Sequence, residues 1–406
     1  MSAFPLPIVD LDTFLASPNS PSAIAEATKT AEALIEYGAL IVKDSRVSEE
    51  ANERFLDLME DYFSQDKERL EEDLRPEVHF QVGVTLENTE KPKCHSNDAC
   101  KAVIAALDPA ERPLDLEGGN ADPKCRFFHR MGNPPPSTSF PSLAMSNVTP
   151  RAFASTWKTQ MEDWGTQIKR AVEDVSEMLA VGLGLERDEL RRAGQYGSHL
   201  LAPTATDLAK YGRVGESVSS LRRLSVLEGD RSDARIVLAV FAGFHTDLNF
   251  LTIHGRSRYA GLHVWARNSG KRISVKLPPG HLLVQAGKQL EHLTGGLILA
   301  GYHEVVCTPA TLASLSARQS STSPSASRPP IRISSTFFWH LSNDYVLRPR
   351  EFLEKVGRGE VVGREREKQL RENGEVPWER KETAYEEGMM VGTLVQNELK
   401  EIALHA

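Results

Sequence analysis

The first part of the chain alternates short apolar runs with longer amphipathic stretches. Ser20 can cap the free N–H groups of a helix and Pro21 fits its first position, so a helix is predicted to begin there and to end at Gly38. The apolar run Ala39–Val42 is partly β-branched, which favours a buried strand. The acidic stretch that follows favours another helix. Residues Pro7 to Phe63 therefore predict a strand-helix-strand-helix module.

Residues 66–147 show neither a helical nor a strand period. They are polar and contain clusters of Asn, Pro, Gly and Asp, such as Gly132–Pro136, so long loops are expected there. No chemistry is assigned to this segment.

A helical period returns after this segment. Apolar residues recur every three or four positions and predict one long amphipathic helix that ends at Gly182 and Gly184. Its aromatic residues are better explained by core packing than by a cofactor site. The apolar stripe consists of Trp157, Met161, Trp164, Ile168, Val172, Val175 and Leu179.

After Gly194 the pattern changes to short alternating or apolar runs separated by Gly, Pro and Asn, which is typical of a β-rich domain. Residues 308–330 are rich in Ser, Ala and Thr and are predicted to form a flexible insertion. The charged tail ends in a predicted helix over Glu386–Ile402. These changes divide the chain into four segments, 1–147, 148–193, 194–345 and 346–406.

Composition narrows the class of function. The formal net charge is -8, which gives no reason to expect a nucleic acid or an anionic membrane as partner, so a small-molecule ligand is expected. The amino terminus lacks the basic and apolar regions of a secretory signal, and no apolar stretch is long enough to span a bilayer, so a cytoplasmic location is predicted. The 4 cysteines show no CxxC spacing, and reduced thiols are expected. The oligomeric state stays open.

A candidate metal site begins at the end of an apolar strand. Side chains alternate between the faces of a strand, so His245 and Asp247 can point the same way. His303 lies on a second strand-like run after a Gly-rich turn and is the best third ligand. Two imidazoles and one carboxylate leave adjacent positions open, which is the arrangement of non-haem iron(II) oxygenases. Packing or supporting roles are assigned to the other nearby histidines, His254, His281 and His292.

Two more polar residues share one face of the apolar strand Ile331–Trp339. Arg332 offers a planar fork to a carboxylate and Ser334 adds a hydroxyl donor, so together they would hold the distal acid of a dicarboxylic co-substrate. A structural salt bridge is the alternative for this arginine. Phe338 has the same parity and is a candidate for the substrate pocket, with core packing as its alternative.

On these residues, the stretch from His199 to His340 resembles the isopenicillin N synthase-like branch of the iron(II)/2-oxoglutarate-dependent dioxygenases. The opening Pro7–Leu11 and the run Tyr37–Val42 are also similar to this family, whereas residues 66–147 lie largely outside the resemblance. The matching positions are, in order, His245-Thr-Asp247, Leu251-Thr-Ile253, Gly261-Leu-His-Val264, Gly287, Leu293-Thr-Gly-Gly296, His303 and Arg332-x-Ser334.

The resemblance implies an α+β protein with a double-stranded β-helix (jelly-roll) core, flanking helices and an N-terminal α/β region. It implies iron(II) bound by His245, Asp247 and His303, and 2-oxoglutarate bound by Arg332 and Ser334, with ascorbate as a candidate reductant. Dioxygen would decarboxylate the co-substrate to succinate and CO2 while a small organic substrate undergoes hydroxylation, desaturation or cyclisation. Halogenation is disfavoured because halogenating members lack the carboxylate.

One departure from the family keeps an alternative open. The family's Asn-x-Tyr-Pro stretch, whose tyrosine helps to bind the co-substrate, corresponds here to Leu200–Pro203. An iron-dependent oxidase that does not use 2-oxoglutarate, with Arg332 and Ser334 holding a substrate carboxylate, is therefore the nearest alternative. A non-catalytic jelly-roll binding protein is the alternative from another class, and the intact ligand set argues against it.

Overall fold

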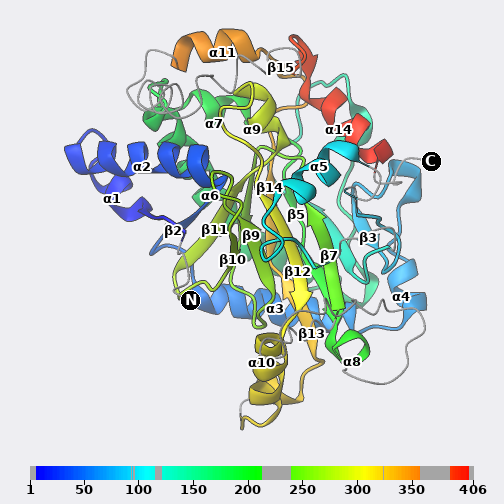
Figure 1. Ribbon diagram of the computed structural model, residues 1–406. Coiled ribbons are helices and arrows are strands. Elements are labelled where there is room, and N and C mark those ends of the chain that lie inside the picture. The colour runs from blue at the N-terminus through cyan, green and yellow to red at the C-terminus, as the bar shows by residue number, and fades with distance from the viewer. Residues whose placement is uncertain are drawn as a thin grey trace.

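The strands of the computed structural model form two large sheets (Figure 1). The structure describes residues 6–92, 94, 97–114, 121–212, 239–322, 324–356 and 385–401. The larger sheet contains, in spatial order, β1 (Ile8–Asp10), β2 (Ala39–Lys43), β11 (His281–Ala286), β8 (Leu251–His254), β14 (Thr336–Trp339), β5 (Leu200–Leu201), β4 (Cys125–Arg130), β6 (Thr204–Asp207) and β13 (Ile331–Ser334), with β3 (Gly83–Thr85) paired to β4. The smaller sheet contains β10 (Arg272–Ser274), β9 (Leu262–Trp265), β12 (Tyr302–Cys307) and β7 (Ala239–His245).

Antiparallel pairing dominates both sheets, and helices lie outside them (Figure 1). The described helices are α1 (Leu11–Ala16), α2 (Pro21–Tyr37), α3 (Glu49–Phe63), α4 (Lys67–Glu71), α5 (Asp98–Ala106), α6 (Trp157–Gly182), α7 (Glu189–Ala193), α8 (Leu208–Tyr211), α9 (Lys288–Leu293), α10 (Pro309–Gln319), α11 (Pro349–Val356) and α14 (Val391–Glu401). Two further strands, β15 (Val346–Leu347) and β16 (Met389–Met390), pair antiparallel with each other. The architecture is a double-stranded β-helix with flanking helices, and the predicted fold class is confirmed.

The amino-terminal module forms as the local signals predict. Ser20 accepts a hydrogen bond from the Ala23 backbone N–H at 3.2 Å, which caps α2. Gly38 ends α2 in the left-handed region with φ 66°, a conformation that favours glycine. β2 then pairs with β11 and joins the module to the larger sheet.

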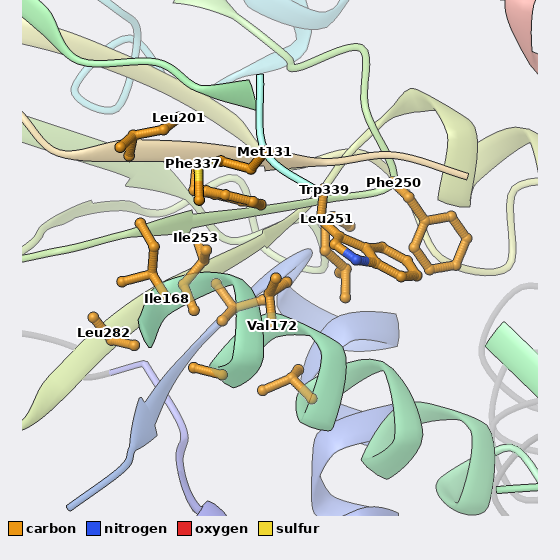
Figure 2. Packing of buried hydrophobic residues seen from close by; sticks show 14 of the residues in the cluster. Met131, Ile168, Val172, Leu201, Phe250, Leu251, Ile253, Leu282, Phe337 and Trp339 are labelled. Carbon is orange, nitrogen blue, oxygen red and sulfur yellow. The ribbon is translucent and has the colours of Figure 1, made fainter. Parts of the chain in front are cut away.

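Helix α6 covers the outer face of the larger sheet. Figure 2 shows Ile168 and Val172 of this helix against Ile253 of β8 and Phe337 of β14. Alternation along β8 and β14 sends the intervening side chains to the inner face, which leaves that face for polar groups. One hydrophobic cluster contains residues from all four predicted segments of the chain. Every residue of the apolar stripe predicted for α6 is buried.

Part of the segment predicted to be a flexible insertion is helical. Thr308 caps α10 through a reciprocal hydrogen-bond pair with Thr311. Arg318 from this helix meets the buried carboxylate of Glu60 through two contacts of 2.8 Å. Residues 308–330 are polar in composition, yet they contain a capped helix that is ion-paired to α3. The prediction of a flexible insertion is therefore wrong for residues 309–319.

Other expectations also need correction. Residues 66–147 contain long loops, but β4 lies inside the larger sheet. Cys94 and Cys100 form a disulfide, which contradicts the expectation of reduced thiols for these two, while Cys125 and Cys307 are free. The predicted terminal helix is present but begins at Val391, and Ile402 lies outside the described residues. Among the described helices, none combines the length and apolarity needed to cross a membrane.

Candidate metal centre and substrate pocket

The three predicted metal ligands come together on the smaller sheet. His303 of β12 is the register partner of His245 at the end of β7, and Asp247 follows two residues later. Asp247 Oδ1 lies 3.8 Å from His245 Nε2 and 3.7 Å from His303 Nε2. One potential ligand atom from each residue lies within 4.8 Å of the other two. This spacing suits one ion between two imidazole nitrogens and a carboxylate oxygen.

Neighbouring groups orient these side chains. His245 Nδ1 donates to the Gly243 carbonyl oxygen at 2.6 Å, so its Nε2 lone pair faces the centre of the triad. Thr252 donates to Asp247 Oδ2 at 2.7 Å and leaves Oδ1 toward the imidazoles. His303 Nδ1 lies 3.5 Å from the Gly301 carbonyl oxygen, which is a weaker restraint.

The charge states also suit a cation. Burial lowers the pKa of His245 to about 3, and the nearby His303 acts in the same direction, so the imidazole is neutral and can donate a lone pair. Burial opposes ionisation of Asp247, but both imidazoles and the Thr252 hydrogen bond outweigh it and hold the pKa of this carboxyl below its usual value. The triad therefore offers an anionic carboxylate beside the neutral imidazole of His245.

Arg332 and Ser334 lie on β13, and Arg332 is buried at 4% exposure. Arg332 Nη1 donates to Ser334 Oγ at 2.6 Å, and its Nε donates to the Ala260 carbonyl oxygen at 3.2 Å. Within the part of the chain that the structure describes, no carboxylate lies within 4.0 Å of this guanidinium, so the salt-bridge alternative finds no support there. Burial lowers the pKa of Arg332 to about 10. A buried arginine held only by neutral groups fits an anionic ligand.

A cavity of about 180 Å³ adjoins the triad. Ser334, Thr336 and Phe338 line it from β13 and β14, while Arg332 lies behind Ser334. Leu200 of β5 lines the cavity in the segment that corresponds to the family's tyrosine motif, and it offers no hydroxyl. The described residues that line the cavity also include Gln81, Glu90, Asp122, Lys124, Arg126, Phe128, Thr204, Ala242, Leu248, His254, Leu262, Val305, His340, Val395, Glu398 and Leu399.

Residues that the sequence analysis missed form another side of the cavity. We call Glu90, Asp122, Lys124 and Arg126 the charged wall. Lys124 Nζ lies 2.6 Å from Asp122 Oδ2 and 3.4 Å from Glu90 Oε2, and Arg126 Nη2 lies 2.5 Å from Glu90 Oε1. One sequence pattern could have identified three of them, because the chain spaces Asp122, Lys124 and Arg126 two residues apart. In an extended segment this spacing places their side chains on one face.

The other histidines have supporting positions. His254 lines the cavity and contacts Thr336 Oγ1 and Gln285 Nε2, each at 3.1 Å. His292 Nε2 lies 2.8 Å from the Glu386 carbonyl oxygen, at the chain segment that leads to α14.

Comparisons with known proteins agree with this geometry. A family model described as the 2OG-Fe(II) oxygenase superfamily matches residues 229–341. A full-length Neurospora crassa protein in complex with alpha-KG has a similar structure, with TM-score 0.64, 17% identity, and coverage of 97% of this chain and 96% of that one. A 2OG-Fe(II) oxygenase family protein of Caulobacter crescentus gives TM-score 0.65, 18% identity, and coverage of 99% and 100%.

A third similar structure is JOX2 in complex with 2OG, Fe and JA, with TM-score 0.54, 15% identity, and coverage of 86% of this chain and 78% of that one. At these identities the structural likeness concerns the fold. No curated protein matches the sequence.

Proposed function

The chain belongs to the 2OG-Fe(II) oxygenase superfamily through its domain at residues 229–341, and on this premise we propose that His245, Asp247 and His303 bind the iron of a dioxygenase that oxidises a small organic substrate. The chain is an iron(II)- and 2-oxoglutarate-dependent oxidoreductase, and the neighbours bound to the co-substrate agree with this. The convergence of three donor atoms beside a cavity is the observation that carries the assignment of ligands.

Each proposed residue has one task. The imidazoles of His245 and His303 and the carboxylate of Asp247 would hold the ion from one side, which leaves its other side toward the cavity. Thr252 fixes the carboxylate and the Gly243 carbonyl oxygen fixes the His245 ring. Iron(II) held by these residues would supply the redox chemistry by which dioxygen oxidises 2-oxoglutarate to succinate and CO2.

Arg332 is proposed to hold the distal carboxylate of 2-oxoglutarate. Its guanidinium is buried, has no acidic partner among the described residues, and contacts Ser334, whose side chain lines the cavity. An entering carboxylate would satisfy both groups through charge-assisted hydrogen bonds. Phe338 is proposed as a substrate contact because its ring lines the same cavity.

The substrate is proposed to be a small organic molecule. The cavity volume of about 180 Å³ and its mixture of apolar and polar side chains favour one. The similar Neurospora crassa protein has been seen with thymine and JOX2 with JA, which are also small molecules. Hydroxylation, desaturation and cyclisation remain the candidate outcomes. We also propose a cytoplasmic location, and ascorbate as an auxiliary reductant.

Anaerobic titration tests the proposal. The metal-free protein is titrated with iron(II) and then with 2-oxoglutarate, and the visible charge-transfer band of a chelated keto acid is recorded. The band is expected for the unmodified protein and for Arg54→Ala, which changes an exposed arginine on α3, and it is expected to be lost in Arg332→Ala. An equal band in Arg332→Ala would overturn the role of this arginine.

The second candidate is an iron oxidase that takes its electrons from the substrate alone. The observation in its favour is Leu200, which gives the cavity no phenol for the co-substrate. Iron binding without the charge-transfer band, together with oxygen uptake that does not depend on 2-oxoglutarate, would favour this candidate.

A further inference from the structure

A small chamber adjoins the main cavity on the side of α14. Its volume is about 20 Å³, which is close to the space that one water molecule or one hydroxyl group needs. Four side chains line both spaces and form the boundary between them, namely Gln81, Leu200, His340 and Val395. A ligand in the main cavity can therefore place one small polar group at this boundary.

Two hydrogen bonds fix the tautomer of His340. The Leu341 backbone N–H donates to Gln289 Oε1 at 3.0 Å, which settles the orientation of the Gln289 amide. The amide nitrogen lies 2.9 Å from His340 Nδ1 and donates to it. His340 Nε2 therefore carries the ring hydrogen. Burial lowers the pKa of this imidazole to about 3, with Arg130 acting in the same direction, so the ring is neutral.

His340 Nε2 is a donor that no described residue uses. The residue is only 5% exposed, and this nitrogen makes no hydrogen bond within the described part of the chain, although it is not fully enclosed. The ring lines both the main cavity and the chamber, so its remaining accessible surface faces these two spaces. A buried donor that faces a cavity calls for an acceptor on a ligand.

Gln81 supplies an acceptor at the same boundary. Its Nε2 donates to the His79 carbonyl oxygen at 3.2 Å, so its carbonyl oxygen Oε1 is the atom left over. Oε1 makes no hydrogen bond to the described residues and is not fully enclosed. Because the chamber has room for about one oxygen atom, a single group there can reach both His340 and Gln81.

We propose that this boundary recognises the substrate through a hydroxyl group, which makes the substrate a small neutral alcohol. The hydroxyl oxygen accepts from His340 Nε2, and the hydroxyl hydrogen is donated to Gln81 Oε1. The apolar remainder of the molecule lies in the main cavity, which Phe128 and Phe338 line. This inference rests on the proposed function and names the substrate class of that site.

The donor and acceptor pair favours a hydroxyl over charged groups. A carboxylate brings two oxygen atoms into a space for about one, and it has no hydrogen to donate to Gln81. An ammonium cannot accept from His340, and it would meet the positive charge of Arg130, which also lines the chamber. An ether accepts from His340 but leaves Gln81 without a donor.

Calorimetric titration of the protein loaded with Ni(II) and 2-oxoglutarate tests this assignment, because nickel replaces iron and turnover is avoided. Benzyl alcohol serves as the hydroxyl probe. Its isomer anisole has the same atoms but can only accept a hydrogen bond, and benzoate is the anion. Benzyl alcohol is expected to bind about tenfold or more tightly than either of the other two.

Variants link that preference to the boundary. His340→Phe keeps a planar ring without the donor and is expected to bind benzyl alcohol and anisole alike. Gln81→Met removes the acceptor, leaves the hydrogen bond between Gln289 and His340 in place, and is expected to reduce the preference. The matched variant His281→Phe changes a histidine of β11 that lines neither space and is expected to keep it. Normal loading with Ni(II) and 2-oxoglutarate shows that a variant is folded.

Equal binding of benzyl alcohol and anisole to the unmodified protein would mean that the chamber takes an ordered water only, and it would overturn the inference. Tighter binding of benzoate, no binding of any probe, or a preference that survives in both His340→Phe and Gln81→Met would also overturn it. Normal loading with 2-oxoglutarate in these cases leaves the proposed function intact. Failure of the unmodified protein to load with 2-oxoglutarate would instead overturn the proposed function, and the inference with it.

Discussion

His303 lies opposite His245 across the pair of strands β7 and β12, with the two ring centroids 4.2 Å apart. Asp247 faces both rings from the residue that follows the end of β7 by two positions. A cation between these groups neutralises the carboxylate and uses both nitrogen lone pairs. Loss of one of these three side chains should therefore weaken metal binding by the other two.

Replacement of Asp247 by alanine removes the only anion of the triad. We expect iron affinity to fall about 100-fold or more, and succinate release to stop. Metal content after dialysis and succinate formation check this. Asp163→Ala, which removes a surface carboxylate on α6, is the control and should behave as the unmodified protein. Undiminished succinate formation by Asp247→Ala would contradict the assignment.

Thr252→Val keeps the side-chain shape but removes the hydrogen bond to Asp247 Oδ2. The carboxylate then loses its orientation, and iron affinity should fall about 10-fold to 100-fold. Competition with a coloured chelator measures the change. Thr30→Val removes a hydroxyl bound to a helix carbonyl in α2 and should leave the affinity unchanged. Equal affinities of the two variants would show that Thr252 does not position the ligand.

His129 gives the protein a pH-dependent stability. Burial lowers the pKa of this imidazole in the folded state to about 4, with Lys158 acting in the same direction, against an ordinary value of 6.5. The unfolded chain therefore takes up the proton first as pH falls. Above pH 6.5 the neutral ring makes its full contribution to the free energy of unfolding. As the pH falls from about 6.5 to 4, this contribution decreases by about 1.4 kcal/mol per pH unit.

Urea unfolding of the metal-free protein at several pH values measures this slope. His129→Gln should reduce the slope of the free energy of unfolding against pH, in the acid range, by the equivalent of about one proton. His281→Gln, which changes the first residue of β11, serves as the matched control. An unchanged slope in His129→Gln would show that this ring is already protonated in the folded protein.

Helix α14 closes one side of the cavity with Val395 and Leu399. A charge at Leu399 would weaken apolar contact with the substrate and leave the co-substrate site untouched. We expect Leu399→Glu to raise the Michaelis constant of the small molecule that stimulates succinate release about tenfold or more, with little change in 2-oxoglutarate affinity. Lys400→Glu, at the next and exposed position, is the control. A similar effect from both variants would exclude a specific role for α14.

Glu60 joins α3 to the segment between β8 and β9 and to the segment after β12. Its carboxylate is 1% exposed and contacts Arg258, Arg318 and Arg328 at 2.8 to 3.0 Å. Glu60→Leu removes the buried anion that contacts all three guanidinium groups and should lower the free energy of unfolding by about 3 to 5 kcal/mol. Urea unfolding compares it with Glu50→Leu, whose carboxylate is exposed. A loss of under 1 kcal/mol would show that the cluster is screened by water.

Local rules were sufficient for the amino-terminal module and for the alignment of His245 with Asp247. Ser20, Pro21 and Gly38 act within one helix, and alternation along a strand is enough to align His245 with Asp247. Arg126 of the charged wall was missed because β4 carries charged residues at alternate positions, which hides the apolar alternation that marks a buried strand.

Long-range contacts explain the other failures. Val395 and Leu399 reach the cavity only because α14 returns to the barrel, and no local pattern encodes that return. Arg318 joins α10 to α3 through Glu60, which lies 258 residues away in the chain. Neither relationship can be read from composition.

Gly243 connects the charged wall, on one side of the cavity, to His245 of the triad through its backbone. Its N–H holds Asp122 of the charged wall, and its carbonyl oxygen holds the His245 ring. A Cβ atom here would lie 2.9 Å from the Pro92 ring, so a larger residue would displace that proline. A molecule that shifts Asp122 on entering would thus move His245, the proposed metal ligand, through a single residue, and the absorption spectrum of the iron-loaded protein would report its arrival.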